Sequence, residues 1–239
     1  MSTDPSRPLG PPVLNWTPPP APEGAVLEGS FARLEPLAAE AHAAQLFDAY
    51  EGHDWLWDYM AYGPFHSAAL YHRWVREVET GSDPLFYAIR DLDSGDLGGV
   101  ASFLRVTPAH GTIEIGNINF APRMQRSRAA SEAIVLMMGW AFDAGYRRCE
   151  WKCDALNSPS RRAAQRLGFS YEGLFRQHLV IKGRNRDTAW FAVTDQDWPA
   201  LRQAYAAWLG AENFDAEGRQ VQRLSDLTRP LRAGSDPAL

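Results

Sequence analysis

The stretch Thr112-Ile113-Glu114-Ile115-Gly116-Asn117-Ile118-Asn119-Phe120 carries the clearest sign of the fold in this 239-residue chain. Ile113 and Ile115 occupy odd-numbered positions, whereas Ile118 and Phe120 occupy even-numbered ones. Side chains of a regular strand alternate strictly between two faces, so these four cannot share a face without an interruption. One extra residue near Gly116 repairs the phase and predicts a β-bulge, which bends the strand and leaves backbone groups unpaired. The alternative is a strand that ends at Gly116.

A short basic loop follows this strand and leads into a helix predicted over Ser127–Ala144. Its sequence, Gln125-Arg126-Ser127-Arg128-Ala129-Ala130, combines small residues with positive charge in a chain whose formal net charge is −5. A helix start presents free N–H groups and the positive end of the helix dipole, an arrangement that binds phosphate. We therefore predict an anion site here, strengthened by Arg123. The alternative is a helix capped by Ser127 with a solvated basic first turn.

A second helix start follows the next predicted strand. Residues Asn157–Phe169 read NSPSRRAAQRLGF. Ser158 is predicted to cap the helix, and Pro159 to occupy its first position. Asn157 and Ser160 then lie at the end of a strand, where open α/β sheets bind their ligands. The alternative is a helix that is merely well capped.

The remaining periodicity predicts a mixed α/β (α+β) fold. Strands are expected at Val26–Leu34, Leu85–Arg90, Leu97–Val106, Thr112–Phe120, Arg147–Asp154, Phe169–Ile181 and Thr188–Thr194. Helices are expected at Ala38–Tyr50, Ser67–Glu79, Ser127–Ala144, Ser158–Leu167 and Trp198–Leu209. This order predicts a mixed, mostly antiparallel sheet of six to seven strands, with helices on both faces and a bulged fourth strand.

The two ends of the chain differ in composition from the middle. Residues 1–24 hold 8 of the 17 prolines, which excludes a helix or central strand and predicts an extended arm. Trp16 either docks this arm on the domain or belongs to a loose tail. Residues 25–210 form the predicted domain, and residues 211–239 a polar tail with one amphipathic turn near Val221–Leu227.

Taken in order, these features resemble the GNAT superfamily of N-acetyltransferases, over about Gly24 to Asp195. Within it the chain is most similar to the branch of ribosomal-protein N-terminal (RimJ/RimL-like) acetyltransferases. The family's pyrophosphate loop reads Gln/Arg-x-x-Gly-x-Gly/Ala. Gln125 matches its first position and Ala130 its last, whereas Arg128 replaces the middle glycine. The Asn-x-x-Ser pattern followed by Leu-Gly-Phe is the more specific match.

The resemblance implies acetyl-CoA as the co-substrate and assigns its contacts to three segments. It places the pyrophosphate on Gln125, Arg126, Ser127, Arg128, Ala129 and Ala130, and the pantetheine arm on Ile118, Asn119, Phe120 and Asn157. It also places Ser160 near the thioester sulfur. No metal is expected, because the six histidines are scattered and form no metal-ligand spacing.

Acetyl transfer needs a neutral amine, a polarised thioester and a protonated leaving thiol. An α-amino group has a pKa of about 8 and a lysine about 10.4, so a lysine acceptor needs more help from a base. Glu114 beside the bulge is the candidate base, although it also fits an ordinary surface glutamate. Backbone N–H groups freed by the bulge are expected to polarise the thioester carbonyl, and Ser160 to donate a proton or hydrogen bond to the thiolate.

Direct transfer without an acetyl-enzyme is expected, because neither cysteine is placed to be activated. Cys149 and Cys153 alternate with charged residues as in a strand, which separates them by about 13 Å. A disulfide needs Cα atoms within about 7 Å. We therefore expect two reduced core cysteines.

An aromatic segment between the first two helices, Trp55–Phe65, is expected to shape the acceptor site, as that region does in the family. Its side chains suit an apolar or cationic acceptor. The candidate acceptor contacts are Trp55, Trp57, Tyr59 and Tyr62. The alternative is that most of these rings belong to the core.

Composition limits the partners. A net charge of −5 gives no general reason to bind nucleic acid or an anionic membrane. The apolar run Ala133–Phe142 is about half of the ~20 residues that span a bilayer, and residues 1–24 lack an apolar signal core, so a cytoplasmic location is expected. The expected partners are acetyl-CoA and an amine acceptor, either a protein N-terminus or a small amine. A homodimer is compatible with the sequence. The alternative function is a non-catalytic acyl-CoA-binding module.

Overall fold

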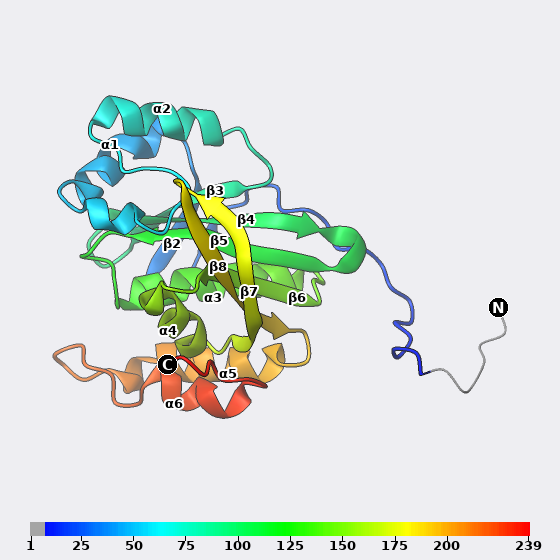
Figure 1. Ribbon diagram of the computed structural model, residues 1–239. Helices are drawn as coiled ribbons and strands as arrows, with labels where there is room; N and C mark the ends of the chain where they lie inside the picture. The colour runs from blue at the N-terminus through cyan, green and yellow to red at the C-terminus, as the bar shows by residue number, and fades with distance from the viewer. Residues whose placement is uncertain (1–7) are drawn as a thin grey trace.

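The computed structural model describes residues 8–239. Its centre is an eight-stranded sheet in the order β1-β2-β3-β4-β5-β6-β8-β7 (Figure 1). The strands are β1 (Leu27–Glu28), β2 (Ala32–Pro36), β3 (Leu85–Asp91), β4 (Leu97–Thr107), β5 (Thr112–Phe120), β6 (Arg148–Asp154), β7 (Ser170–Ile181) and β8 (Arg184–Thr194). Neighbours pair antiparallel except β5 and β6, which are parallel. The predicted mixed, mostly antiparallel sheet is confirmed, with one strand more than expected.

The additional strand arises because the first predicted strand folds into a small hairpin, β1 and β2. Its turn is built around the carboxylate of Glu132, which accepts hydrogen bonds from the backbone N–H groups of Ser30, Phe31 and Ala32 at 2.6 to 2.9 Å. Glu132 is only 5% exposed. A buried carboxylate needs such donors, and it lies about one hundred residues away in sequence. Local periodicity therefore gave no sign of the turn.

Helices cover both faces of the sheet, as expected (Figure 1). They are α1 (Ala39–Tyr50), α2 (Ala68–Val78), α3 (Arg128–Asp143), α4 (Ser158–Arg166), α5 (Trp198–Leu209) and α6 (Leu224–Thr228). One buried cluster joins α1 and α2 to one face of the sheet, and the other joins α3, α4 and α5 to the opposite face. Strand alternation supplies both: Phe86 and Ala88 of β3 belong to the first cluster, Tyr87 and Ile89 to the second.

The predicted bulge in Thr112–Phe120 is confirmed. Ser102 of β4 pairs with Gly116, whereas Val100 pairs with Asn119, so β5 has one residue more than β4 over this interval. Asn117 takes the left-handed conformation, with φ 51°. Asparagine tolerates this region better than most residues because its short polar side chain bonds locally. Its amide Nδ2 donates to Ser102 Oγ at 2.9 Å.

The sheet opens between its two parallel strands. β5 and β6 pair over only three residues each, 112–114 with 148–150. Beyond them β5 pairs only with β4, and β6 only with β8. The side chains and backbone groups that face this opening have no strand partner there, which leaves room for a ligand at the centre of the sheet.

Residues 8–24 of the predicted arm and the segment after α5 contact the domain at several points; residues 1–7 of that arm lie outside the described residues. Trp16 donates from its indole N–H to the Ala109 carbonyl at 3.2 Å, so the arm is docked there. Near the other end, Leu224 is fully buried, and Asp236 pairs with Arg161 of α4. Among residues 8–239, no helix has the length and apolar character to span a membrane.

Candidate active site

A cavity of about 230 Å³ lies where β5 and β6 separate. We call it the sheet cavity. Strands β5 to β8 supply most of its lining, and residues Tyr59–Ala61 of the aromatic segment reach its edge. Five of the residues that the sequence singled out line it: Tyr59, Glu114, Ile118, Asn157 and Ser160. Residues far apart in sequence thus meet in one place.

Glu114 is buried in this cavity and paired with cations. It is 5% exposed, with Oε2 2.6 Å from Lys152 Nζ and 3.4 Å from Arg105 Nε. Burial raises the pKa of Glu114, and the Lys152 charge opposes that rise. Burial likewise lowers the pKa of Lys152. Glu114 is therefore no ordinary surface glutamate, because its protonation depends on the cavity around it.

Asn157 and Ser160 begin α4 in a way that corrects the predicted cap. Asn157 Oδ1, not the Ser158 side chain, accepts from the Ser160 N–H at 3.1 Å. The helix starts at Ser158, so Pro159 is its second residue. Asparagine and serine cap helices about equally well, and the sequence alone did not separate them. Ser160 Oγ accepts from the Trp151 indole N–H at 3.0 Å. Its own hydroxyl proton is not used in that bond and lies beside the Cys153 thiol, whose pKa burial raises and this contact lowers.

The two cysteines are free and buried, as predicted. They follow the alternation of β6, in which Cys149, Trp151 and Cys153 face the core. Burial raises the pKa of Cys153 to about 11, and it raises that of Cys149 further. Both thiols stay protonated at neutral pH, which makes them poor nucleophiles.

The basic loop leads into α3 as expected. Ser127 is the N-cap, and its Oγ accepts from the Ala130 N–H at 2.9 Å. The N–H groups of Arg128 and Ala129, in the first helical turn, have no intrahelical acceptor. The side chains of Ala129 and Ala130 are buried against the core, whereas Ser127 and Arg128 are half-buried and reach the surface. The loop therefore offers backbone donors and the helix dipole to an anion.

The three arginines near this loop are used differently. Arg128 lies over the rings of Phe31 and Phe214, at 4.3 and 4.7 Å, and 3.4 Å from Asp93. Arg123 donates to the Leu97 carbonyl. Arg126 is exposed and forms no ion pair with the residues that the structure describes. Its guanidinium alone is fully available to a ligand.

The residues expected to contact pantetheine point in different directions along β5. Ile118 lines the sheet cavity. The Asn119 carbonyl accepts from the Tyr50 hydroxyl at 2.9 Å, and its buried Nδ2 has no partner among residues 8–239. Phe120 packs against the backbone of Gly99, where a Cβ would come within 2.5 Å of its ring. Gln125 donates to the Phe120 carbonyl at 2.9 Å and ties the loop to the strand end.

The four aromatic candidates for the acceptor site do not gather in one place. Tyr59 lines the sheet cavity, with its hydroxyl 3.2 Å from the Leu156 carbonyl. Tyr62 stacks on Trp74 and donates to Asn117 at 3.4 Å. Trp57 is 2% exposed and belongs to the core cluster under α1 and α2. Trp55 is 54% exposed and does not line the sheet cavity.

Three charged or titratable residues of the sheet cavity were not predicted from the sequence: Lys152, His178 and Arg186. Lys152 was detectable, because alternation with the core residues of β6 places it on the opposite face. His178 was not, because it belongs to an irregular part of β7, where the pairs Phe175 with Thr188 and Leu179 with Arg186 leave three residues unmatched against one.

His178 adds a neutral proton acceptor to the cavity. Its Nδ1 is 2.9 Å from Thr188 Oγ1. Burial lowers the pKa of His178, and the nearby charges of Lys152, Arg186 and Arg105 lower it further. The imidazole is therefore uncharged at neutral pH. No group of three His, Cys, Asp or Glu side chains suited to a metal ion occurs among the described residues.

Comparison with known proteins agrees with this geometry. The family model of the acetyltransferase (GNAT) domain matches residues 32–170. A GCN5-related N-acetyltransferase from Brucella melitensis is 47% identical, with a TM-score of 0.89, over 91% of this chain and 100% of that one. A probable GNAT-family acetyltransferase from Chromobacterium violaceum is 39% identical, with a TM-score of 0.76, over 83% and 100%. The chain belongs to the GNAT acetyltransferase family.

More distant structures share the fold. One is an acetyltransferase from Salmonella typhimurium that modifies the N-terminal serine of ribosomal protein L7/L12; it is 20% identical, with a TM-score of 0.61, over 71% of this chain and 99% of that one. No curated protein matches the sequence significantly. Membership of the family implies acetyl transfer with acetyl-CoA as the co-substrate.

Proposed function

We propose that this protein is an N-acetyltransferase that moves the acetyl group of acetyl-CoA directly onto a primary amine held in the sheet cavity. The observation that carries the proposal is the meeting of Glu114 and Ser160 in one cavity, at the point where the sheet opens. A proton acceptor and a proton donor that line the same cavity are what amine acylation needs.

Acetyl-CoA would bind along β5 and the start of α3. The free N–H groups of Arg128 and Ala129, together with Arg126, suit the pyrophosphate. The unpaired backbone around Ile118 and the orphaned Nδ2 of Asn119 offer polar contacts to the amide-rich pantetheine arm. The thioester would then reach the bulge, close to the Asn157 turn.

The residues of the cavity have complementary parts in the transfer. Glu114 removes a proton from the acceptor ammonium through a water molecule, and the amine lone pair then attacks the thioester carbonyl carbon. N–H groups at the bulge, near Asn117, stabilise the developing oxyanion. The C–S bond breaks, Ser160 gives its hydroxyl proton to the thiolate, and the proton lost by the acylated nitrogen returns to Ser160. Lys152 helps to keep Glu114 ionised between turnovers.

The acceptor amine is a protein N-terminus or a small molecule. The sheet cavity holds charges of both signs, with Glu114, Asp154, Lys152 and Arg186 in its lining. Such a lining suits an acceptor that carries a carbonyl or carboxylate beside its amine. An α-amino group also needs less help from the base than a lysine does.

The test is a panel of peptides, amino acids and polyamines assayed for release of free CoA. On the best acceptor, Glu114→Gln is expected to lower kcat about 10²-fold, and Ser160→Ala about tenfold, with acetyl-CoA binding retained. Glu172→Gln is the matched control, since Glu172 is a carboxylate that bonds to Arg148 and does not line the sheet cavity. If no amine is acetylated, the protein is an acyl-CoA-binding module instead.

A further inference from the structure

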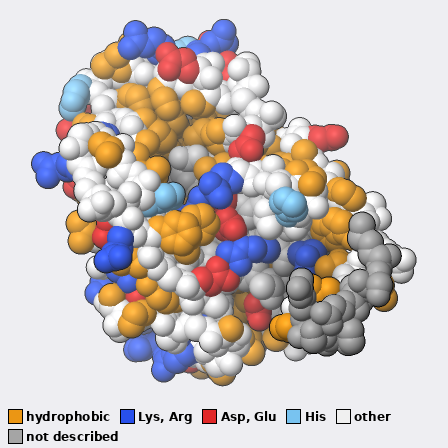
Figure 2. Space-filling view, turned by 45° about the vertical axis from the view of Figure 1, so that its right-hand side comes forward, with side chains coloured by type: hydrophobic (Ala, Val, Ile, Leu, Met, Phe, Trp, Pro, Cys, Tyr) orange, Lys and Arg blue, Asp and Glu red, His pale blue; other side chains and the backbone are white. Residues whose placement is uncertain are grey.

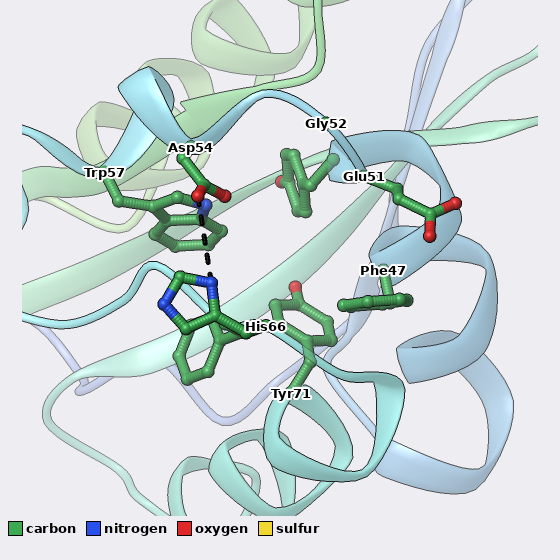
Figure 3. A pocket seen from close by; sticks show the side chains of 9 residues that line it. Phe47, Glu51, Gly52, Asp54, Trp57, His66 and Tyr71 are labelled. Atoms are coloured by element: carbon green, nitrogen blue, oxygen red, sulfur yellow. Dashed lines mark ion pairs between the residues drawn. The ribbon is translucent and has the colours of Figure 1, made fainter.

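A second cavity, of about 330 Å³, lies between the end of α1, the short helix η1 (Asp54–Trp57) and α2. We call it the helix cavity. Aromatic rings of α1, η1, α2 and the loop before α2 line it, together with Glu51, Asp54 and His66 (Figure 3). None of these residues lines the sheet cavity. Nothing in the proposed transfer uses it.

The walls of the helix cavity are aromatic rings set at steep angles to one another. Trp57 meets Phe65 at 5.1 Å and 89°, and Phe65 meets Tyr71 at 5.2 Å and 82°. Tyr50 meets Trp57 at 5.3 Å and 73°. These rings contact one another edge to face. They form a rigid floor, and the half-buried rings of Phe47 and Phe65 are the ones that face the open space. Their faces carry partial negative charge, so they favour a cation over a neutral molecule of the same shape.

The rim of the cavity is acidic. Glu51 and Asp54 are both exposed there, and no Lys or Arg is among the lining residues. Within residues 8–239, Glu51 forms no salt bridge, and the contact of Asp54 is with His66 at 3.7 Å. Carboxylates that have no Lys or Arg partner and lie beside aromatic rings attract a cation from solution. The space-filling view shows exposed hydrophobic side chains near the top of the molecule, in the region of α1 and α2 (Figure 2).

The cavity also contains a hydroxyl group without a partner. Tyr71 is 1% exposed, and its hydroxyl has no hydrogen-bond partner among the described residues. In Figure 3 it points towards the middle of the lining side chains. Burial raises its pKa, so it remains a neutral hydroxyl whose oxygen can accept. An unsatisfied buried hydroxyl costs free energy, which a ligand N–H would recover.

From the aromatic walls, the acidic rim and the orphaned hydroxyl, we infer that the helix cavity binds a small alkylammonium ion. The ion would rest on the half-buried rings of Phe47 and Phe65, face Glu51 and Asp54, and donate towards Tyr71. This goes beyond the proposed acetyl transfer, because it assigns a second amine site outside the sheet cavity. The Tyr50 hydroxyl bond to the Asn119 carbonyl joins the two regions.

The experiment is a calorimetric titration of the full chain with n-butylammonium, with n-butanol as the neutral counterpart. We expect saturable binding of the cation, with a dissociation constant on the order of 1 mM, and none of the alcohol. The double variant Glu51→Gln/Asp54→Asn should weaken binding at least about tenfold. The matched control, Asp48→Asn/Glu77→Gln, removes two exposed acids of α1 and α2 outside the cavity and should change little.

Two further variants separate the helix cavity from the sheet cavity. Tyr71→Phe should weaken n-butylammonium several-fold, and Glu114→Gln should leave its binding unchanged. Equal affinity of n-butanol and the cation would overturn the inference. So would loss of binding in Glu114→Gln with retention in the rim variant, because the amine would then occupy the sheet cavity. Failure of acetylation with intact n-butylammonium binding would count against the proposed function alone.

Discussion

The sheet cavity and the helix cavity are of similar size, but they differ in the elements and in the kinds of side chain that line them. Strands line the first, and it holds paired charges of both signs, such as Glu114 with Lys152. Helix ends and a loop line the second, and it holds aromatic rings with a rim of acids. Strand alternation fixes which side chains face an opening in a sheet. No comparable alternation tells which aromatic rings of a helix or loop face a cavity. Tertiary packing decides which of them lie in the core and which line the cavity.

The largest expected effect is on the stability of the helix cavity. Trp57→Ala should lower the free energy of unfolding by about 3–5 kcal/mol, because the indole is 2% exposed and packs on Tyr50, Tyr62, Phe65 and Tyr71. Urea unfolding measures it. Trp55→Ala, at a ring 54% exposed, is the control and should change little. If Trp57→Ala is as stable as the wild type and has a raised acceptor KM, Trp57 contacts the acceptor and is not a core residue.

The next effect concerns the charges of the sheet cavity. Lys152→Met removes the cation that holds down the pKa of Glu114, so burial should raise that pKa further. A base works only when ionised, so the ascending limb of the pH–rate profile should move to higher pH. The carboxyl group takes up a proton more readily once unpaired, which limits the cost of leaving it buried.

Arg148→Gln is the control for Lys152→Met. Arg148 lies on the same strand, but its partners are Glu150 and Glu172, so the limb should stay where it is in the wild type. An unmoved limb in Lys152→Met, measured as kcat over pH 5 to 9, would mean that Glu114 is not the titrating base.

Much of the fold was predictable, because its signals are local. The bulge at Asn117 followed from the parity of four apolar residues, and the start of α3 from Ser127. The hairpin turn around Ser30 was not, since its N–H groups bind Glu132, about one hundred residues away. The cap of α4 was assigned to Ser158 rather than Asn157, because both residue types satisfy the same donors.

The candidate site divides in the same way. Glu114, Asn157 and Ser160 were found from strand parity and strand-end motifs, and the structure brings them together. His178 was missed because the irregular pairing of β7 turns it into the cavity. In the aromatic segment, composition gave no means of separating Tyr59, which reaches the sheet cavity, from Trp57, which packs in the core.

The smallest expected effect lies where the aromatic segment meets the sheet cavity. Tyr59→Phe keeps the ring and removes only the hydroxyl, which donates to the Leu156 carbonyl at 3.2 Å beside the turn that ends in Asn157. Tyr59 is 38% exposed, so the bond contributes at the low end of the usual 0.5–1.5 kcal/mol, or about two- to threefold in equilibrium. Its loss should loosen the edge of the cavity and raise the acceptor KM by about that factor. Acetyl-CoA affinity should not change, because the hydroxyl contacts neither β5 nor α3.

Tyr62→Phe is the control: it removes a longer, 3.4 Å bond to Asn117 at the bulge and should act on kcat rather than on the acceptor KM. An unchanged acceptor KM in Tyr59→Phe would show that the Tyr59 hydroxyl does not help to bind the acceptor. The aromatic segment would then serve the helix cavity, and the acceptor would depend on the strands of the sheet cavity.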